Sequence, residues 1–287
     1  MRISVVIPFR NEERYIERCL RALTTQQDVE GEHEVVAVSD RSTDGSADIV
    51  RSFAGVRLLE SHAPGPYAAR NVGAAATTGD IVAFTDADCE PRADWLRELA
   101  AAFGDRSALA VLGTRSPARD SYALSLLASY DRARDDYIFG GRRADLYYGS
   151  ANNCAFRRAA FTEFGGFAER RRGADMLLVR RLVERYGPNV VVYSPRVRIR
   201  HLEIEHVSDY YRKSFVYARS LQRLNGTTQG RMLRTSERLL LWRDAARQER
   251  VSRASSTALL ALLGGGMACW GLGRLTVTLT GGREQAA

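Results

Sequence analysis

The sequence predicts an α/β fold: a mixed, mainly parallel sheet flanked by helices, followed by a helical tail at the C-terminus. Two observations support this prediction. Short apolar segments alternate with segments of helical spacing through the first third of the 287 residues, a pattern typical of parallel sheets with helical crossovers. After Asn225 the composition changes to amphipathic and uncharged segments, which favour helices.

Apolar runs and turn-forming residues set the individual elements. Between residues 12 and 24, for example, Ile16, Cys19, Leu20 and Leu23 recur at helical spacing. The expected strands are 3–7, which Pro8 ends, 34–39, 56–60, 81–85, 108–114, 152–156 and 190–193. The expected helices are 12–24, 44–53, 67–76, 95–103 and 175–186. Residues 122–148 are rich in Arg, Asp and Tyr and receive no assignment.

The bulk composition is that of a globular protein. Hydrophobic residues make up 45% and charged residues 26%, so a core of normal size can form. The net charge of +8 comes almost wholly from arginine, because Lys213 is the only lysine. Arginine suits phosphate and anionic surfaces, although solvation explains most individual arginines. The basic residues are spread out and no nucleic-acid-binding motif is present, so we expect nucleotide phosphate or anionic lipid rather than nucleic acid as partner.

The cysteines and the N-terminus bear on the compartment. Cys19, Cys89, Cys154 and Cys269 are far apart and form no CxxC pair, which argues against a zinc site and a disulfide framework. Reduced thiols are typical of the cytoplasm. The sequence opens directly on the apolar run 3–7 without a charged-then-apolar signal segment. We therefore expect a cytoplasmic protein.

Residues 226–287 form the predicted amphipathic and apolar tail. Residues 231–253 are basic and include Trp242, whereas 257–273 carry no charge. That length is near the lower limit of a membrane span, which needs about 17–25 residues, and its glycines are better tolerated in membrane helices than in soluble ones. A buried helical hairpin is the alternative. The preceding arginines favour an interfacial anchor on the cytoplasmic face of a membrane.

Two carboxylates follow the predicted strand 81–85. Asp86 and Asp88 stand two residues apart at its end, where ligands bind in open α/β sheets. Such a pair can converge on one hard cation, Mn²⁺ or Mg²⁺, that keeps positions open for phosphate oxygens. The cation would neutralise the charge that develops on a diphosphate leaving group. This spacing elsewhere usually means two solvated acids, so the preceding apolar strand is what favours a metal site.

Four segments extend this interpretation to a family. They are ISVVIPFRNE from residue 3, VSDRSTDGS from residue 38, GPYAARNVGAAATTGDIVAFTDAD from residue 65, and GSANNCAFRR with FGGF between residues 149 and 167. In this order they resemble the inverting glycosyltransferases of family 2, which have the Rossmann-like GT-A fold. The resemblance covers roughly residues 1–220. It implies a catalytic domain over 1–225, with a nucleotide-sugar-binding half at 1–100 and an acceptor half at 101–225.

The resemblance implies that six residues bind the donor: Pro8, Arg10, Glu12, Asp40, Arg70 and Asp86. Pro8, Arg10 and Glu12 lie in the first loop, which lines the nucleoside pocket in the family. Asp40 matches the acid that contacts the base, usually uracil, and Arg70 matches the basic residue that meets the donor phosphates or the base. Arg10 stands where an aromatic residue is frequent, and its guanidinium can stack on a base.

Three residues are implied as metal ligands. Asp86 and Asp88 match the family's contacts to the donor ribose and to the metal. His201 follows the run 197–200, where related enzymes often place a histidine near the metal or the diphosphate. Imidazole is a suitable third ligand, although a lone histidine is more often structural. The implied cofactor is a divalent cation, Mn²⁺ or Mg²⁺.

Asp175, in Gly173-Ala174-Asp175, matches the family's general base. An inverting transfer needs a base that takes the proton of the acceptor hydroxyl as the anomeric carbon is attacked. A carboxylate just before a helix, near the carboxyl edge of the sheet, suits that role, and capping of the helix 176–186 is the alternative. Ala174 replaces the acid that usually precedes the base, so acceptor recognition departs from the family pattern.

The implied activity is metal-dependent transfer of a sugar from a nucleotide diphosphate sugar, favouring a UDP-sugar, to an acceptor hydroxyl of a glycan, a lipid or a small molecule. No Q-x-x-R-W follows Asp175, which argues against a processive synthase. A nucleotidyltransferase or a dinucleotide dehydrogenase would need a glycine-rich loop after residues 3–7, where PFRNE stands. A catalytically impaired nucleotide-sugar-binding or membrane scaffold protein stays open, because 173–175 departs from the family pattern.

Overall fold

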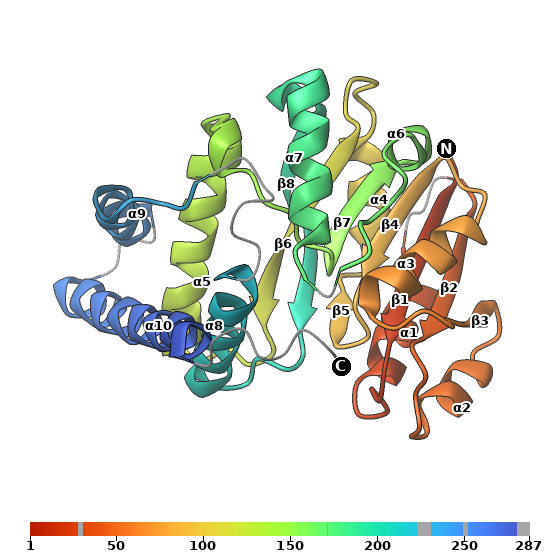
Figure 1. Cartoon of the computed structure of the whole chain (residues 1–287), viewed down its shortest axis with the longest axis horizontal. Coiled ribbons are helices and arrows are strands. Elements are labelled where there is room, and N and C mark those ends of the chain that lie inside the picture. Colours follow the sequence, from red (N-terminus) through yellow and green to blue (C-terminus); the bar gives the residue numbers. More distant parts are fainter. Residues whose placement is uncertain (28–30, 171, 223–230, 249–251, 280–287) are drawn as a thin grey trace. The chain divides into compact units, whose positions relative to one another are not determined.

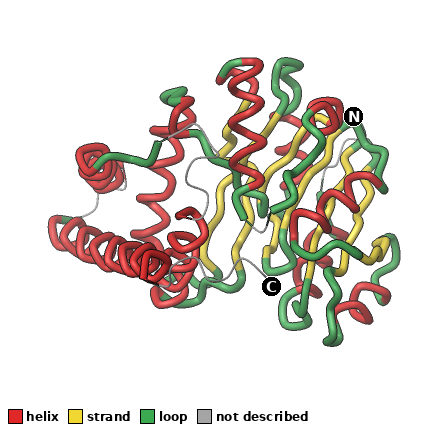
Figure 2. The backbone as a smooth tube through the Cα atoms, viewed as in Figure 1, coloured by secondary structure: helices red, strands yellow, loops and turns green. Residues whose placement is uncertain are grey.

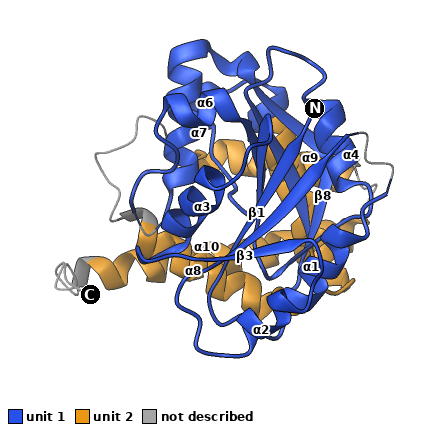
Figure 3. Cartoon of the chain, turned by 90° about the vertical axis from the view of Figure 1, so that its right-hand side faces the viewer, with its two compact units in different colours: residues 1–116, 138–202 blue, residues 117–137, 203–287 orange. Residues whose placement is uncertain are grey.

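The computed structural model describes residues 1–27, 31–170, 172–222, 231–248 and 252–279. The chain falls into two compact units, which Figure 3 colours separately. The first comprises Met1–Ser116 and Ile138–Leu202, and the second comprises Pro117–Tyr137 and Glu203–Ala287. The boundary predicted between residues 225 and 226 lies outside the described residues, and the division into donor and acceptor halves stays a prediction.

The first unit is built on a mixed sheet of eight strands among the described residues. They are β1 (Ile3–Phe9), β2 (His33–Ser39), β3 (Val56–Glu60), β4 (Ile81–Thr85), β5 (Cys89–Pro91), β6 (Ala110–Pro117), β7 (Asn153–Arg157) and β8 (Val191–His201). Their order is β3-β2-β1-β4-β7-β6-β8-β5 (Figures 1 and 2). Strands β1 to β4 pair in parallel, whereas β7 is antiparallel to β4 and β6, and β5 to β8. The predicted α/β class is confirmed.

Helices cover both faces of this sheet. They are α1 (Ile16–Thr24), α2 (Ser46–Arg51), α3 (Pro66–Ala75), α4 (Trp95–Ala102), α6 (Arg158–Glu163) and α7 (Ala174–Tyr186). Because side chains alternate along a strand, Val5 and its odd-numbered neighbours in β1 face one way, into a core with α1 and α4. Val6 faces α3, where a Cβ on Gly73 would lie 2.4 Å from its Cγ1. Glycine at residue 73 thus lets α3 approach the sheet closely, and Figure 1 shows α7 on the same face.

Two strand expectations are corrected. Pro8 does not end β1, which continues to Phe9; pairing with β4 stops at Val6, so the N–H that Pro8 lacks is not needed on that side. The run predicted at 190–193 is only the start of β8, which reaches His201. There buried residues alternate with exposed arginines, as in a strand with one solvated face.

The second unit is helical. Its helices are α5 (Tyr122–Asp135), α8 (Val207–Gln222), α9 (Thr235–Gln248) and α10 (Arg253–Leu279). Leu126 and Tyr130 of α5 share a small core with Leu241 of α9 and Leu259 of α10. The helical tail is therefore confirmed. The unassigned stretch 122–148 forms α5, a π-helical turn at Asp136–Gly140 and a 3-10 turn at Ala144–Leu146.

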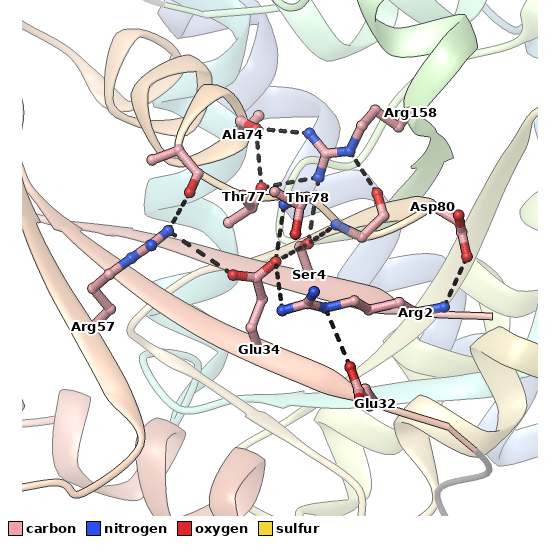
Figure 4. A network of polar contacts seen from close by, with 12 residues as sticks. Arg2, Ser4, Glu32, Glu34, Arg57, Ala74, Thr77, Thr78, Asp80 and Arg158 are labelled. Carbon is pink, nitrogen blue, oxygen red and sulfur yellow. Dashed lines mark hydrogen bonds and ion pairs between the residues drawn. The ribbon is translucent and has the colours of Figure 1, made fainter.

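A polar network secures the starts of β1 and β2, away from the carboxyl edge of the sheet (Figure 4). The Glu34 carboxylate accepts hydrogen bonds from the Ser4 hydroxyl at 2.8 Å and the Thr78 N–H at 3.0 Å. Burial would raise the pKa of Glu34, but these hydrogen bonds lower it on balance. Arg158 donates to the Thr77 hydroxyl at 3.0 Å. The network holds the turn before β4 in place.

Acid should weaken a second ionic contact, at the start of α9. Arg231 donates two hydrogen bonds to Glu237, at 2.6 and 2.8 Å, and they lower the pKa of Glu237 from 4.5 to about 2. The stabilisation from this group is therefore present above pH 4.5 and is lost as the pH falls toward 2. We expect the difference in Tm between the wild type and Glu237→Gln, followed by circular dichroism, to shrink between about pH 6 and about pH 3. A constant difference would contradict this assignment.

Candidate functional site

The carboxyl ends of β1, β2 and β4 meet at one edge of the sheet, because these adjacent strands are parallel. Arg10, Asp40 and Asp86 each follow the last residue of one of these strands. The structure thus brings together three of the residues that the sequence singled out. Pro8 is buried within β1, whereas Arg10 is exposed at the edge.

The loops after β1 and β2 hold each other in place. The Thr43 N–H donates to Asn11 Oδ1 and the Glu12 N–H donates to Ser46 Oγ, each at 2.8 Å. Asn11 and Arg41 both adopt a φ of 55°, a left-handed conformation that asparagine tolerates better than most residues. The loop that carries Arg10 and Glu12 therefore has a defined shape before any ligand arrives.

Asp40 links the end of β2 to the start of α3. Its carboxylate is buried and accepts hydrogen bonds from the Gly65 N–H at 2.9 Å and from Arg41 Nε at 3.3 Å. Gly65 has a φ of 104°, which favours glycine at this position. Asp40 is therefore fixed in orientation next to the exposed Arg41 side chain.

An ion pair between a buried arginine and a partly exposed aspartate joins α3 to the end of β4. The guanidinium of Arg70, which is 4% exposed, donates a short hydrogen bond to Asp86 and lies 5.1 Å from the centre of the Tyr67 ring. Burial raises the pKa of Asp86, Arg70 opposes that effect, and the negative charge of Asp88 adds to it. Two acidic groups held close together and partly shielded from water favour a cation beside them.

Asp88 and His201 meet because β5 and β8 are paired. The pairing sets Cys89 opposite His201, and His201 Nδ1 lies 3.4 Å from Asp88 Oδ2. The ligand atoms of Asp88, Cys89 and His201 all lie within 4.8 Å of one another. Carboxylate oxygen is a ligand that Mn²⁺ and Mg²⁺ prefer, and an imidazole nitrogen can bind Mn²⁺ beside it, so Asp88 and His201 fit the implied cation. The Cys89 thiol does not, because burial raises its pKa and keeps it neutral. Asp86 contacts Arg70 here, and its role as a metal ligand stays a prediction.

Asp175 lies in the first turn of α7 but does not cap it. The N-cap position is Gly173, with a φ of 75°, and glycine has no side chain that could cap the helix. Asp175 Oδ1 accepts a hydrogen bond from the Tyr67 hydroxyl at 2.6 Å, and Oδ2 accepts one from the Ala151 N–H at 3.0 Å. The capping alternative is therefore wrong. A Cβ on Gly149 would lie 2.4 Å from the Asp175 carbonyl carbon, so glycine is needed beside it.

Sequence reasoning missed Tyr67 and Cys89. Burial raises the pKa of Tyr67, as does the negative charge of Asp175, so the Tyr67 hydroxyl stays protonated and donates. Tyr67 stands three residues before Arg70, which puts both on one side of α3. This spacing could have indicated from the sequence that Tyr67 lies beside Arg70 at the site. Cys89 directly follows Asp88 but carried no separate signal.

Comparisons with known proteins bear on the same segments. A family model described as glycosyl transferase family 2 matches residues 4–165, more than half of the chain. Glycosyltransferase AglE of Haloferax volcanii is 40% identical over 99 residues, which cover 33% of each protein. Pre-mycofactocin glycosyltransferase of Mycobacterium tuberculosis is 31% identical over 214 residues, covering 69% of this chain and 44% of that protein. The chain therefore matches from a third to less than half of the length of these curated relatives.

A solved structure shares the fold. The mannosyltransferase PcManGT from Pyrobaculum calidifontis, in complex with GDP-Man and Mn²⁺, superposes with a TM-score of 0.61 and 22% sequence identity. The superposition covers 98% of this chain and 79% of that one. At this level of identity the comparison establishes the GT-A type of fold, in agreement with the strand order and helix layers described above.

Proposed function

Because the chain belongs to glycosyl transferase family 2, we propose that it transfers a sugar from a nucleotide diphosphate sugar to an acceptor hydroxyl. The observation that carries this proposal is the hydrogen bond between Tyr67 and Asp175. Tyr67 also contacts Arg70, which lies on the same side of α3, and Arg70 in turn contacts Asp86. These contacts connect Asp175, on the proposed acceptor side, to Asp86, on the proposed donor side. Because these contacts fix the residues proposed to bind the donor and the residue proposed to activate the acceptor, they favour an enzyme over a binding protein that has lost catalysis.

The donor would lie along the carboxyl edge of the sheet. Asp40 and Arg10 stand at the ends of β2 and β1, where the base would bind, and Arg70 would face the phosphates or the base. We favour a uridine diphosphate sugar. The structurally similar mannosyltransferase was solved with GDP-Man, so a guanosine diphosphate sugar is the alternative.

A divalent cation, Mn²⁺ or Mg²⁺, would be held by Asp88 and His201, with Asp86 beside them. When bound, such a cation neutralises the negative charge of the diphosphate leaving group. The presence of Mn²⁺ in the structure of PcManGT supports this assignment. Arg70 would add a positive charge next to Asp86, from a buried position that excludes water.

Asp175 would act as the general base of a non-processive, inverting transfer. Its carboxylate oxygens are oriented by Tyr67 and by the Ala151 N–H, and one of them would take the proton of the acceptor hydroxyl. The acceptor is a glycan, a lipid or a small molecule. We also propose that the protein works on the cytoplasmic face of a membrane, because its C-terminal helices are basic and apolar.

A thermal-stability screen tests the donor proposal. We expect one class of nucleotide diphosphate sugar, uridine or guanosine, to raise the Tm, and to do so only when Mn²⁺ or Mg²⁺ is present. A donor at about 100 times its Kd should stabilise the folded state by about 2.7 kcal/mol. If no donor changes the Tm with either cation, the proposed function is wrong.

Removing the Tyr67 hydroxyl should slow the transfer. Tyr67→Phe keeps the ring, which packs 5.2 Å from Phe167, but removes the hydrogen bond to Asp175. A hydrogen bond to a charged group contributes about 1.5–3 kcal/mol, so we expect kcat to fall by roughly 10- to 100-fold with the donor KM nearly unchanged. An unchanged kcat would remove Tyr67 from the mechanism.

A further inference from the structure

One face of α10 packs against α8. A Cβ on Gly265 would lie 2.6 Å from the Tyr211 hydroxyl, and a Cβ on Gly273 would lie 2.4 Å from the Phe215 carbonyl oxygen. The Tyr211 hydroxyl also donates to the Leu262 carbonyl at 2.9 Å. Two glycines eight residues apart therefore let α8 and α10 pack in close contact, and this contact explains why a long helix carries them.

The opposite face of α10 is exposed and apolar. Leu260, Met267 and Leu275 are 42–52% exposed, and at 100° per residue they lie on the side away from Gly273, while Leu272, 56% exposed, lies at the edge of that side. By length and composition Arg253–Val277 is apolar enough to cross a membrane, yet only 11% of its most apolar window is buried. The exposed side chains form a stripe along the helix, which we call the apolar stripe of α10.

Close contact with α8 argues against a span. Helix α8 carries Asp209, Arg212 and Lys213, and the last two pair with Glu203 at 3.2 and 2.8 Å. If α10 crossed a bilayer, it would either lose this partner or draw its charged groups into hydrocarbon, which is costly. Among the described residues of α10, the apolar stripe is the part that stays exposed to lipid. That geometry fits a helix lying in the membrane plane.

The charged residues of α9 and α10 indicate which kind of surface the apolar stripe of α10 binds. Arg253 and Arg274 are exposed near the two ends of α10, and the helix contains no acidic residue. On α9, Leu239 and Leu240 are 48% and 47% exposed, and Arg243 is exposed one turn further along. Exposed leucines next to arginines favour a lipid surface with negative charge.

We propose that α10 lies in the plane of an anionic lipid bilayer with its apolar stripe inserted and does not span the membrane. The inference deepens the membrane association included in the proposed function and rests on it. It favours the interfacial arrangement over both a span and a soluble hairpin, because one face of a packed helix would contact lipid.

Vesicle flotation of the full chain tests this inference. We expect binding to vesicles of phosphatidylcholine with phosphatidylglycerol, weaker binding to phosphatidylcholine alone, and release by high salt or alkaline carbonate. The double variant Met267→Asp and Leu272→Asp should bind at least about tenfold less. Ser208→Asp, which adds a charge at an exposed position of α8, is the matched control and should bind like the wild type.

Three outcomes would overturn the inference. If the protein stays on the vesicles after alkaline carbonate, α10 spans the membrane. If the double variant floats with the vesicles as well as the wild type does, the apolar stripe is not the lipid-binding surface. A dimer in solution, seen by light scattering and lost in the double variant, would make the stripe an interface between copies. The donor-dependent shift in Tm, measured on the same variants, separates this test from the proposed function, because failure of membrane binding should leave that shift unchanged.

Discussion

Asp88→Ala is expected to abolish the cation-dependent part of donor binding. The Asp88 carboxylate lies 3.4 Å from His201 Nδ1 and within 4.8 Å of the ligand atoms of Cys89 and His201. Its removal would leave imidazole, a buried thiol and Asp86, whose carboxylate is already paired with Arg70, a set that suits Mg²⁺ and Mn²⁺ less well. Changes in groups that only support a metal ligand cost about 10- to 100-fold in affinity, so loss of the ligand itself should cost at least about 100-fold.

Calorimetry with a nucleotide diphosphate sugar, with and without Mn²⁺, measures this effect. The fold should survive, because the backbone carbonyl of Asp88 still accepts the Leu202 N–H at 2.7 Å. Glu90→Ala, in the short strand β5 that directly follows Asp88, is the matched control: its side chain pairs with Arg18 at 2.9 Å and should not affect the donor. If Asp88→Ala binds the donor as the wild type does in Mn²⁺, the metal assignment is wrong.

The donor edge was predictable because parallel strands place the residues that follow them side by side. For β4, an apolar run ending in a polar residue indicated both the strand and the position of Asp86, whereas the family resemblance singled out Arg10 and Asp40. His201 was harder to assign, since its contact with Asp88 depends on the pairing of β5 with β8, two segments about a hundred residues apart. Only the family resemblance singled it out.

The hydrogen bonds of Asp175 lay outside what the sequence could predict. Tyr67 and Ala151 reach this carboxylate from two segments that periodicity cannot relate to each other. The residues themselves suggested a capping role, which is the usual one for an acid at the start of a helix. Here Gly173 occupies the N-cap position instead.

The helical unit shows a different limit of sequence reasoning. Residues 122–148 were not assigned because their polar side chains obscure the apolar positions, such as Leu126 and Tyr130, that pack against α9 and α10. The glycines of α10 favoured a membrane helix by composition. The structure gives two of them, Gly265 and Gly273, another purpose, the close approach of α8.

Asp175→Asn should keep donor binding but lose sugar transfer. The general base contributes about 10²- to 10⁴-fold to the rate, and an amide cannot take the proton of the acceptor hydroxyl. Asparagine has nearly the same volume, so it should fit beside Gly149, where space is limited. The Tyr67 hydroxyl and the Ala151 N–H both donate to the carboxylate, and an amide oxygen can serve only part of that pattern. Donor binding and Tm must therefore be measured on the variant alongside the rate.

The measurement can be made before the acceptor is known. Water can replace the acceptor hydroxyl, so release of free sugar from the nucleotide diphosphate sugar reports the same proton transfer. We expect Asp175→Asn to slow this hydrolysis by at least about 100-fold, with the donor-dependent shift in Tm retained. Glu184→Gln, which removes an exposed carboxylate from the same helix, should leave the rate unchanged. A variant at residue 175 that hydrolyses the donor as fast as the wild type would transfer the role of base to another group, whereas a wild type that binds the donor and never releases sugar would favour the impaired binding protein.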